Sequence, residues 1–120
     1  MEKTKNISVV IPTYNRPNEI NKTINNVLQQ TFKPYEIIVV DDNSSSKLKL
    51  IKNKKIKYIK LKKNLGVASA RNIGAKKAQS KFLAFLDDDD KWPKNYLEKT
   101  IKENNLIKKK IYLSKINIIR

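Results

Sequence analysis

The sequence predicts an α/β fold with an open, mostly parallel sheet and flanking helices. Short runs of β-branched apolar residues are typical of strands buried on both faces of a parallel sheet. Segments with apolar residues at helical spacing lie between these runs, and clusters of polar turn formers follow them. This alternation favours right-handed crossovers between parallel strands. The clearest apolar runs are ISVVIP (7–12), EIIVV (36–40) and FLAFL (82–86).

The amino-terminal elements are predicted to be a strand, a helix and a second strand. The first strand, residues 7–12, ends at Pro12, and the turn TYNRP follows it. Pro17 is suited to the first turn of the next helix. Residues 36–40 predict a second buried strand that runs into the turn formers DDNSSS. The helix between these strands carries apolar residues at helical spacing, namely Ile20, Ile24, Val27 and Leu28.

The middle of the chain is predicted to hold a third strand between two helices. We expect a short lysine-rich helix near residues 46–53. Residues 56–61 (IKYIKL) predict a strand near an edge of the sheet, because lysines interrupt its apolar pattern. Residues 64–79 begin with a glycine turn and continue in small residues, which predicts a helix packed close against the sheet.

The carboxyl-terminal part is predicted to contain a strand, a helix and one more strand. Residues 82–86 form the fourth buried strand, and Pro93 opens a helix. Residues 108–120 carry apolar residues suited to a last strand but show no turn or cap at their end. We therefore expect a single domain over residues 1–120 that is truncated at its carboxyl terminus. The predicted helix has one shared face, made of Tyr96, Leu97, Thr100 and Ile101.

The composition narrows the classes of function. The 27 Lys and Arg residues and 11 Asp and Glu residues give a net charge of +16. This charge favours a polyanionic partner, or it reflects a general bias towards Lys, Asn and Ile. The absence of cysteine and histidine excludes disulfides, thiolate metal sites and imidazole catalysis. Because the apolar runs are far shorter than the about 20 residues that span a bilayer, we expect a cytoplasmic protein.

Acidic residues gather where predicted strands end. In an open α/β sheet ligands bind outside the carboxyl ends of the strands, so these residues should converge on one crevice. The run DDDD has two interpretations. It could cap the following helix, or it could hold a hard divalent cation, because Mg²⁺ and Mn²⁺ prefer carboxylate and water oxygens. Six of the 11 acidic residues take such positions, namely Asp41, Asp42 and Asp87 to Asp90.

Two further motifs have both a structural and a functional interpretation. DDNSSS (41–46) either forms an Asx-type turn or places an Asp against a nucleobase N–H or a ribose hydroxyl. NLGVASARN (64–72) is either an ordinary helix start or a ligand contact. In the second case Gly66 permits close approach and Arg71 offers a fork for phosphate or sugar. Neither GxGxxG nor a P-loop motif occurs, so the phosphates would be held by a metal ion.

Together these motifs resemble the amino-terminal half of the family 2 glycosyltransferases. Those enzymes have the GT-A fold, with a Rossmann-like nucleotide-binding half. The resemblance covers roughly residues 7–98 in the family's order and spacing. The matching segments are SVVIPTYNR (8–16), LQQTFKPYEIIVVDDNSS (28–45), NLGVASARNIG (64–74) and FLDDDDKWPKNYLE (85–98).

The resemblance implies that the chain binds a nucleotide-diphosphate sugar, expected to be UDP-linked, and transfers the sugar with inversion. Asp42 would contact the base, and Arg71 would lie near the diphosphate or sugar. The family's D-x-D motif falls on Asp87 to Asp89, with Asp87 and Asp89 as ligands of Mn²⁺ or Mg²⁺. The implied nucleotide-sugar-binding residues are Pro12, Tyr14, Asn15, Asp42, Asn64, Arg71 and Asp88.

The resemblance leaves the acceptor side of the reaction unassigned. The family's carboxylate base is expected beyond residue 120, and the acceptor is expected to be a glycan or a lipid-linked molecule. Ser46 also stands where the family usually has an acidic residue. Two other hypotheses stay open, a basic module that binds nucleic acid or an anionic membrane, and an inactive fragment. The ordered acidic clusters argue against nucleic acid, whereas the charge allows peripheral contact with the inner face of a membrane.

Overall fold

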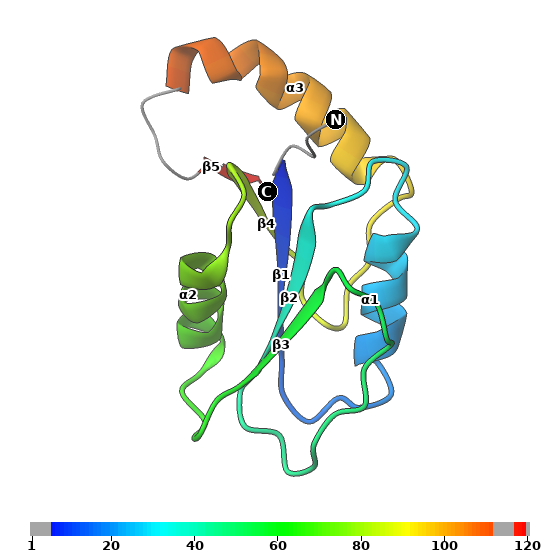
Figure 1. The fold of residues 1–120 in the computed structure, drawn as a ribbon, viewed down its shortest axis with the longest axis vertical. Helices are drawn as coiled ribbons and strands as arrows, with labels where there is room; N and C mark the ends of the chain where they lie inside the picture. Colours follow the sequence, from blue (N-terminus) through cyan, green and yellow to red (C-terminus); the bar gives the residue numbers. More distant parts are fainter. Residues whose placement is uncertain (1–5, 112–116, 120) are drawn as a thin grey trace.

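The computed structural model describes residues 6–111 and 117–119 and contains the predicted α/β sheet (Figure 1). Five parallel strands lie in the order β3-β2-β1-β4-β5, so β3 is at an edge, as predicted. The strands are β1 (Ile7–Thr13), β2 (Glu36–Asp41), β3 (Ile56–Lys60), β4 (Phe82–Phe85) and β5 (Asn117–Ile119). The helices are α1 (Ile20–Leu28), α2 (Val67–Lys77) and α3 (Tyr96–Ile111). The predicted fold class is confirmed.

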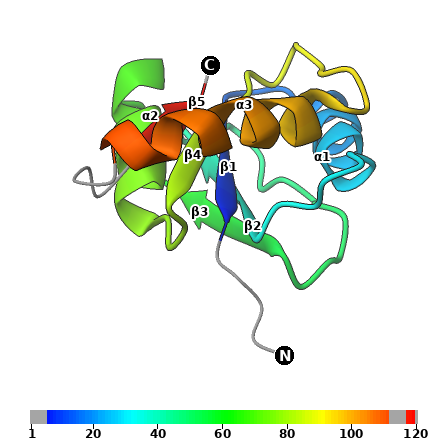
Figure 2. The same ribbon diagram turned by 90° about the horizontal axis from the view of Figure 1, so that it is seen from above.

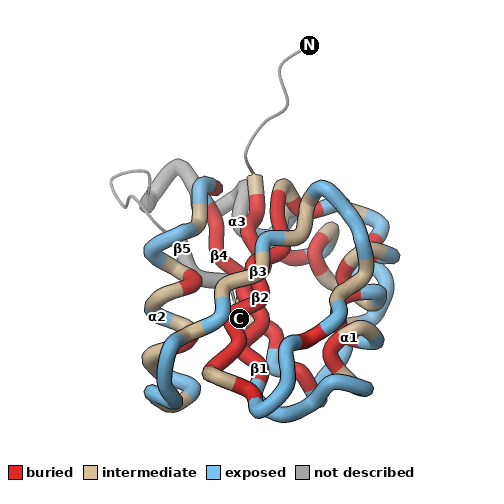
Figure 3. The backbone as a smooth tube through the Cα atoms, turned by 60° about the horizontal axis from the view of Figure 1, so that its bottom comes forward, coloured by how far each residue is buried: buried red, intermediate tan, exposed pale blue. Residues whose placement is uncertain are grey.

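The alternation of side chains along the strands divides the apolar residues between two cores. One core lies between the sheet and α1, with the start of α3, and the other lies between the sheet and α2. Figure 1 shows α1 and α2 on opposite sides of the sheet, and Figure 3 shows its central strands as buried. The first core includes Val9, Ile11, Ile37 and Val39, and the second includes Val10, Ile38, Val40 and Leu83. Full burial of such a side chain stabilises the fold by about 1.5–3 kcal/mol.

Helix α2 lies very close to the sheet because small residues face it. Ala70 and Gly74 are its buried residues. A Cβ atom added at Gly74 would lie 2.4 Å from Cγ1 of Val10, which is closer than two such carbon atoms can approach. The predicted close packing is therefore confirmed, although the helix begins only at Val67, directly after Gly66.

The prediction of a helix near residues 46–53 was wrong, because tertiary contacts hold this segment in an irregular conformation. Leu48 is 5% exposed and packs into the first core. The side chain of Asn21, on α1, donates a hydrogen bond to the Lys49 carbonyl oxygen at 2.8 Å. It also accepts one from the Ile51 N–H at 3.0 Å. These contacts satisfy backbone groups that a helix would have paired internally.

Two prolines precede their helices instead of opening them, which corrects their predicted positions. Pro17 lies in a turn, and α1 begins three residues later at Ile20. Pro93 likewise lies before α3, which begins at Tyr96. Gln30 meets the start of α3, because its Oε1 accepts a hydrogen bond from the Leu97 N–H at 3.1 Å.

The end of the chain contributes a strand at the other edge of the sheet. Strand β5 pairs in parallel with β4, as predicted for this region. The strand is shorter than the predicted segment 108–120, because residues 108–111 belong to α3. Residues 112–116 and 120 of that segment lie outside the described residues. Figure 2 shows α3 crossing above the sheet between α1 and α2.

The order of the strands creates a switch point at the carboxyl ends of β1 and β4. The chain passes from β1 to β2 on one side, whereas β4 pairs with β1 on the other side. The loops that follow β1 and β4 therefore diverge. In open α/β sheets a crevice for ligands forms at such a point.

Candidate functional site

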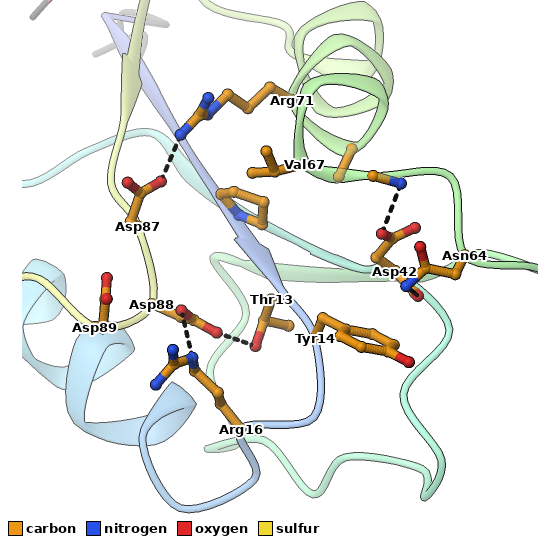
Figure 4. Close-up of a pocket in the computed structure, with 13 residues that line it drawn as sticks. Thr13, Tyr14, Arg16, Asp42, Asn64, Val67, Arg71, Asp87, Asp88 and Asp89 are labelled. Carbon is orange, nitrogen blue, oxygen red and sulfur yellow. Dashed lines mark hydrogen bonds and ion pairs between the residues drawn. The ribbon is translucent and has the colours of Figure 1, made fainter.

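A pocket of about 560 Å³ lies at this switch point. Its walls come from the loops after β1, β2, β3 and β4 and from the start of α2 (Figure 4). The pocket brings together all the site residues predicted from the sequence except Asn15. Those in its lining are Pro12, Tyr14, Asp42, Asn64, Arg71, Asp87, Asp88 and Asp89.

Asp42 holds the loop that leads into α2. Its carboxylate accepts hydrogen bonds from the N–H groups of Leu65 and Gly66 at 2.7 and 2.9 Å. Gly66 has a φ of 96°, a backbone conformation that favours glycine because it has no Cβ. Each carboxylate oxygen has a second lone pair. Asp42 can therefore support the loop and still accept a hydrogen bond from a ligand in the pocket.

Tyr14 and Asn64 form one wall of the pocket together with Asp42. The Tyr14 side chain lies beside Asp42 and Asn64 in Figure 4, and the residue is 47% exposed. The Asn64 Nδ2 donates a hydrogen bond to the Asp42 carbonyl oxygen at 3.3 Å. An exposed aromatic ring beside carboxylate and amide groups suits a planar heterocycle that carries N–H donors. We call these three residues the aromatic wall.

Asn15 joins two loops and does not line the pocket. Its φ is 54°, in the left-handed region that Asn tolerates better than most residues. The Asn15 N–H donates to Ser44 Oγ, and the Ser45 N–H donates to Asn15 Oδ1, both at 2.8 Å. Asn15 therefore fixes the loop after β1 against the loop after β2.

Asp41 forms the Asx-type turn that was one interpretation of DDNSSS. The residue is fully buried, and its Oδ1 accepts hydrogen bonds from the N–H and the hydroxyl of Ser44. The Tyr58 hydroxyl donates to Asp41 Oδ2 at 2.6 Å. Burial, together with this hydrogen bond to Asp41, raises the pKa of Tyr58 to about 12. The structural interpretation therefore holds for Asp41, while Asp42 reaches the pocket.

The carboxylates of the acidic run do not cap the helix that follows. The Asp87 Oδ1 accepts a hydrogen bond from Arg71 Nη2 at 2.8 Å, and the Asp90 Oδ1 accepts one from the Lys91 N–H. Within the described residues, Asp89 and Asp90 form no ion pair. The capping interpretation of the run is therefore not supported.

Asp88 is the buried member of the run. It is 9% exposed, and its carboxylate accepts a hydrogen bond from the Thr13 hydroxyl at 2.7 Å. The Arg16 Nε lies 3.3 Å from its other oxygen. Burial raises the pKa of Asp88, although the Thr13 hydrogen bond and the Arg16 charge oppose that rise. Figure 4 shows the Asp88 side chain pointing towards Thr13 and Arg16, whereas the Asp87 side chain points towards Arg71.

Several lining residues had no assigned role in the sequence analysis. Thr13 and Arg16 belong to the quoted motif SVVIPTYNR, but nothing in the local sequence identifies their partner Asp88. Their position at the carboxyl end of a buried strand is the only signal that could have found them. Val67 and Ala70 line the pocket from the first turns of α2.

A divalent ion at this site would have few protein ligands. Over residues 6–111 and 117–119, no group of three or more His, Cys, Asp or Glu side chains is arranged to hold a metal ion. Mg²⁺, however, is commonly bound through one or two carboxylates together with substrate phosphates. Asp87 and Asp89 are exposed residues in the pocket lining. This donor set fits an ion that shares its coordination with a bound diphosphate.

Comparison with family models decides the family. Residues 8–116 match the model described as "Glycosyl transferase family 2". The chain belongs to glycosyl transferase family 2. The family resemblance inferred from the motifs is thereby confirmed. Divalent metal ions are in general use in this family.

This family 2 chain is similar to proteins that are several times longer. It is 47% identical over 118 residues to an uncharacterized glycosyltransferase of Rickettsia conorii, covering 92% of this chain and 20% of that protein. It is 37% identical over 107 residues to an Escherichia coli protein, the UDP-Glc:alpha-D-GlcNAc-diphosphoundecaprenol beta-1,3-glucosyltransferase WfgD. That match covers 79% of this chain and 39% of WfgD. The chain thus spans less than half the length of these relatives.

A solved structure supports the same fold. Staphylococcus aureus TarS 1–349 in complex with UDP matches this family 2 chain with a TM-score of 0.66 and 29% identity. The match covers 89% of this chain and 33% of the TarS chain. The predicted Rossmann-like sheet of a GT-A glycosyltransferase is consistent with this similarity and with the strand order.

Proposed function

We propose that the chain is the donor-binding half of an inverting, metal-dependent glycosyltransferase that uses a UDP-linked sugar. One observation carries this proposal. The aromatic wall shares a single pocket with a charged end made of Arg71, Asp87 and Asp89. The known complexes of TarS with UDP and with UDP-GlcNAc support a UDP-linked donor for this family 2 chain.

The two ends of the pocket have different roles in donor binding. At one end Tyr14 offers a surface for the nucleobase of the donor, and Asp42 can accept a hydrogen bond from an N–H group of that nucleobase. At the other end the Arg71 guanidinium can pair with phosphate oxygens. A donor held at both ends has its anomeric carbon fixed in position. Such positioning can contribute up to about 7–11 kcal/mol to lowering the barrier of a transfer reaction.

In this proposal Asp87 and Asp89 hold Mn²⁺ or Mg²⁺. A bound divalent ion supplies positive charge next to the diphosphate as it leaves the sugar. We assign Asp88 to the donor side and not to the metal, because Thr13 and Arg16 already contact its carboxylate. Its fixed position would let it accept a hydrogen bond from the nucleotide sugar.

No catalytic base is assigned within residues 1–120. An inverting transfer needs a base within hydrogen-bond reach of the acceptor hydroxyl. Each carboxylate in the pocket lining has a donor-side role in this proposal. We propose that the acceptor site and the base lie in the additional length that the relatives possess. The name of WfgD specifies a diphosphoundecaprenol-linked sugar, which supports a glycan or lipid-linked acceptor for this chain too.

Calorimetric titration with UDP tests the proposal. We expect UDP to bind in the presence of Mn²⁺ and to lose most of its affinity after chelation with EDTA. Asp89→Asn should remove most of this metal dependence without lowering the melting temperature. Asp90→Asn is the matched control, because Asp90 belongs to the same run but does not line the pocket. Equal affinity with and without EDTA would contradict the metal assignment, and no UDP binding in either condition would contradict the donor site.

The distribution of charge favours a second property, peripheral contact with an anionic membrane. Residues 43–86 contain 12 Lys and one Arg but no Asp or Glu. Nine of these lysines fall within residues 47–63, on the edge strand β3 and in the segments beside it, and all but Lys55 are exposed. The described helices lack the length and apolar character of a membrane span. We propose that this basic edge rests on the inner face of the membrane, where a lipid-linked acceptor would be found.

Sedimentation with lipid vesicles tests the membrane contact. Vesicles that contain phosphatidylglycerol should retain the chain, and vesicles of phosphatidylcholine alone should not. Exchange of Lys52 and Lys54 for Glu should weaken retention more than the same exchange of Lys76 and Lys77, which lie on α2. Each lysine that lies close to an anionic membrane surface contributes about 1 kcal/mol to the free energy of binding. Equal effects of the two exchanges would contradict the edge assignment, and tighter binding to RNA than to vesicles would favour the nucleic-acid hypothesis.

A further inference from the structure

In the proposed enzyme Arg71 lies next to two anions, the Asp87 carboxylate and the donor diphosphate. In the structure its Nη2 atom donates to Asp87 Oδ1 at 2.8 Å. The proposed function places the donor diphosphate near Arg71 and a divalent ion on Asp87. Arg71 therefore places a positive charge on the carboxylate that the metal ion would bind, and two cations at one carboxylate repel each other.

The ion pair between Arg71 and Asp87 is exposed and can be exchanged. The two side chains are 38% and 49% exposed, so water can replace either partner. An exposed pair of this kind changes an equilibrium constant by up to about fivefold. The other ion pair of the pocket differs, because the Asp88 side chain is only 11% exposed and also holds the Thr13 hydroxyl. Breaking that pair would leave a buried carboxylate without its cation, which is far more costly.

We propose that Arg71 is an exchangeable counter-ion of the metal site. It neutralises Asp87 in the empty pocket and turns to the diphosphate when the donor arrives, which releases Asp87 for the metal ion. Each anion keeps a cationic partner throughout this exchange. The inference rests on the proposed function, since it requires both a diphosphate in the pocket and a divalent ion on the acidic run.

The exchange predicts that metal ion and nucleotide assist each other through Arg71. Without nucleotide, Mn²⁺ has to displace the Arg71 guanidinium from Asp87. Without metal, UDP has to draw Arg71 away from Asp87. When both bind, the Arg71–Asp87 pair is broken only once, so the second ligand binds without that cost. By thermodynamic linkage, UDP strengthens Mn²⁺ binding by the same factor by which Mn²⁺ strengthens UDP binding.

Titration with Mn²⁺, with the free ion measured by electron paramagnetic resonance, tests the expectation that Arg71 weakens Mn²⁺ binding when no nucleotide is present. We expect Arg71→Met to bind Mn²⁺ without nucleotide up to about fivefold more tightly than the unaltered chain. The factor by which saturating UDP improves Mn²⁺ binding should fall correspondingly. Lys76→Met is the matched control, because it removes one positive charge from the exposed surface of the same helix. Its effect on both quantities should be small.

Titration with UDP in the presence of EDTA tests the second expectation, that Asp87 holds Arg71 back from UDP when no metal ion is bound. Asp87→Asn should free Arg71 and raise the metal-free affinity for UDP by up to about fivefold. Asp90→Asn removes a neighbouring negative charge that has no contact with Arg71, and it should have a smaller effect. Thermal melting followed by circular dichroism should show unchanged stability, because none of the four substitutions alters a buried residue.

The outcomes separate this inference from the function on which it rests. If UDP and Mn²⁺ bind but Arg71→Met behaves like Lys76→Met, the exchange is wrong and the donor site stands. Weaker binding of Mn²⁺ by Arg71→Met would also overturn the exchange. If the unaltered chain binds UDP but no Mn²⁺ at saturating UDP, the metal part of the proposed function fails, and the exchange fails with it.

Discussion

Replacement of Asp42 by Asn should separate two roles that this carboxylate has at the pocket. Asp42 is 5% exposed, and it accepts N–H hydrogen bonds from Leu65 and Gly66 at 2.7 and 2.9 Å. An Asn side chain can keep one of these bonds through its Oδ1. Its NH₂ group then faces the other N–H, and two donors cannot pair. The loop before α2 should lose one of its two anchors.

The size of the effect follows from the bond that is lost. A hydrogen bond to a charged group contributes about 1.5–3 kcal/mol, so the free energy of unfolding should fall by about this amount. In a domain of this size 1 kcal/mol corresponds to roughly 3–6 °C in melting temperature, which predicts a drop of roughly 5–18 °C. The affinity for UDP should also fall, because the loosened loop carries Gly66 and Val67 in the pocket lining.

Thermal melting and calorimetry with UDP, performed on the same preparation, check both effects. Asp90→Asn serves as the control, since it changes the same chemical group at an exposed position outside the pocket. A normal melting temperature with lost UDP binding would refute the anchoring role and leave Asp42 as a ligand contact alone. A lowered melting temperature with normal UDP affinity would refute the assignment of Asp42 as a contact of the nucleobase.

Two further predictions concern the fold away from the pocket. Burial alone would raise the pKa of Glu36, but hydrogen bonds from Lys57, Ser8 and the Gln79 N–H outweigh it and hold the pKa below its ordinary value of 4.5. The ionised Glu36 therefore stabilises the fold fully above about pH 4.5, and this contribution is lost as the pH falls through the lowered pKa. Glu36→Gln should unfold at lower urea concentration at pH 7 and lose less stability between pH 7 and pH 3, and parallel pH profiles would contradict this role. Gly74→Ala should lower the free energy of unfolding by about 1–3 kcal/mol, because its Cβ would meet Val10 Cγ1, and an unchanged melting temperature would show that Val10 moves aside.

The sheet and its pocket could be predicted from the sequence because the strands are almost wholly apolar. Residues 37–40 alternate between the two cores, so every position of this run is buried. Rules for parallel α/β topology then place the carboxyl ends of the strands at one edge. For this reason Asp42 and Asp87 could be assigned to one site before any geometry was known, whereas Arg71 joined them through the family resemblance.

Contacts between distant residues could not be predicted in this way. Residues 46–53 have a composition that a helix accepts, but the Asn21 side chain, 28 and 30 positions away from its partners, decides their path. The hydrogen bond between Thr13 and Asp88 joins residues 75 positions apart. No local pattern marks either contact, since both exist only after the elements have packed.

The acidic run illustrates how a strongly basic chain positions adjacent carboxylates. Exposure alternates from Leu86 to Asp89, which continues the two-residue period of β4 past its end and turns Asp88 inward. Like charges about 4 Å apart repel by roughly 4 kcal/mol near a protein surface, so neighbouring aspartates need cations. Arginines of the described chain meet Asp87 and Asp88, whereas Asp89 is left without an ion pair there. Asp90 also has no ion pair within the described residues but lies outside the pocket lining. The uncompensated charge of Asp89 lies in that lining, where, under the proposed function, it favours a divalent ion that arrives with a diphosphate.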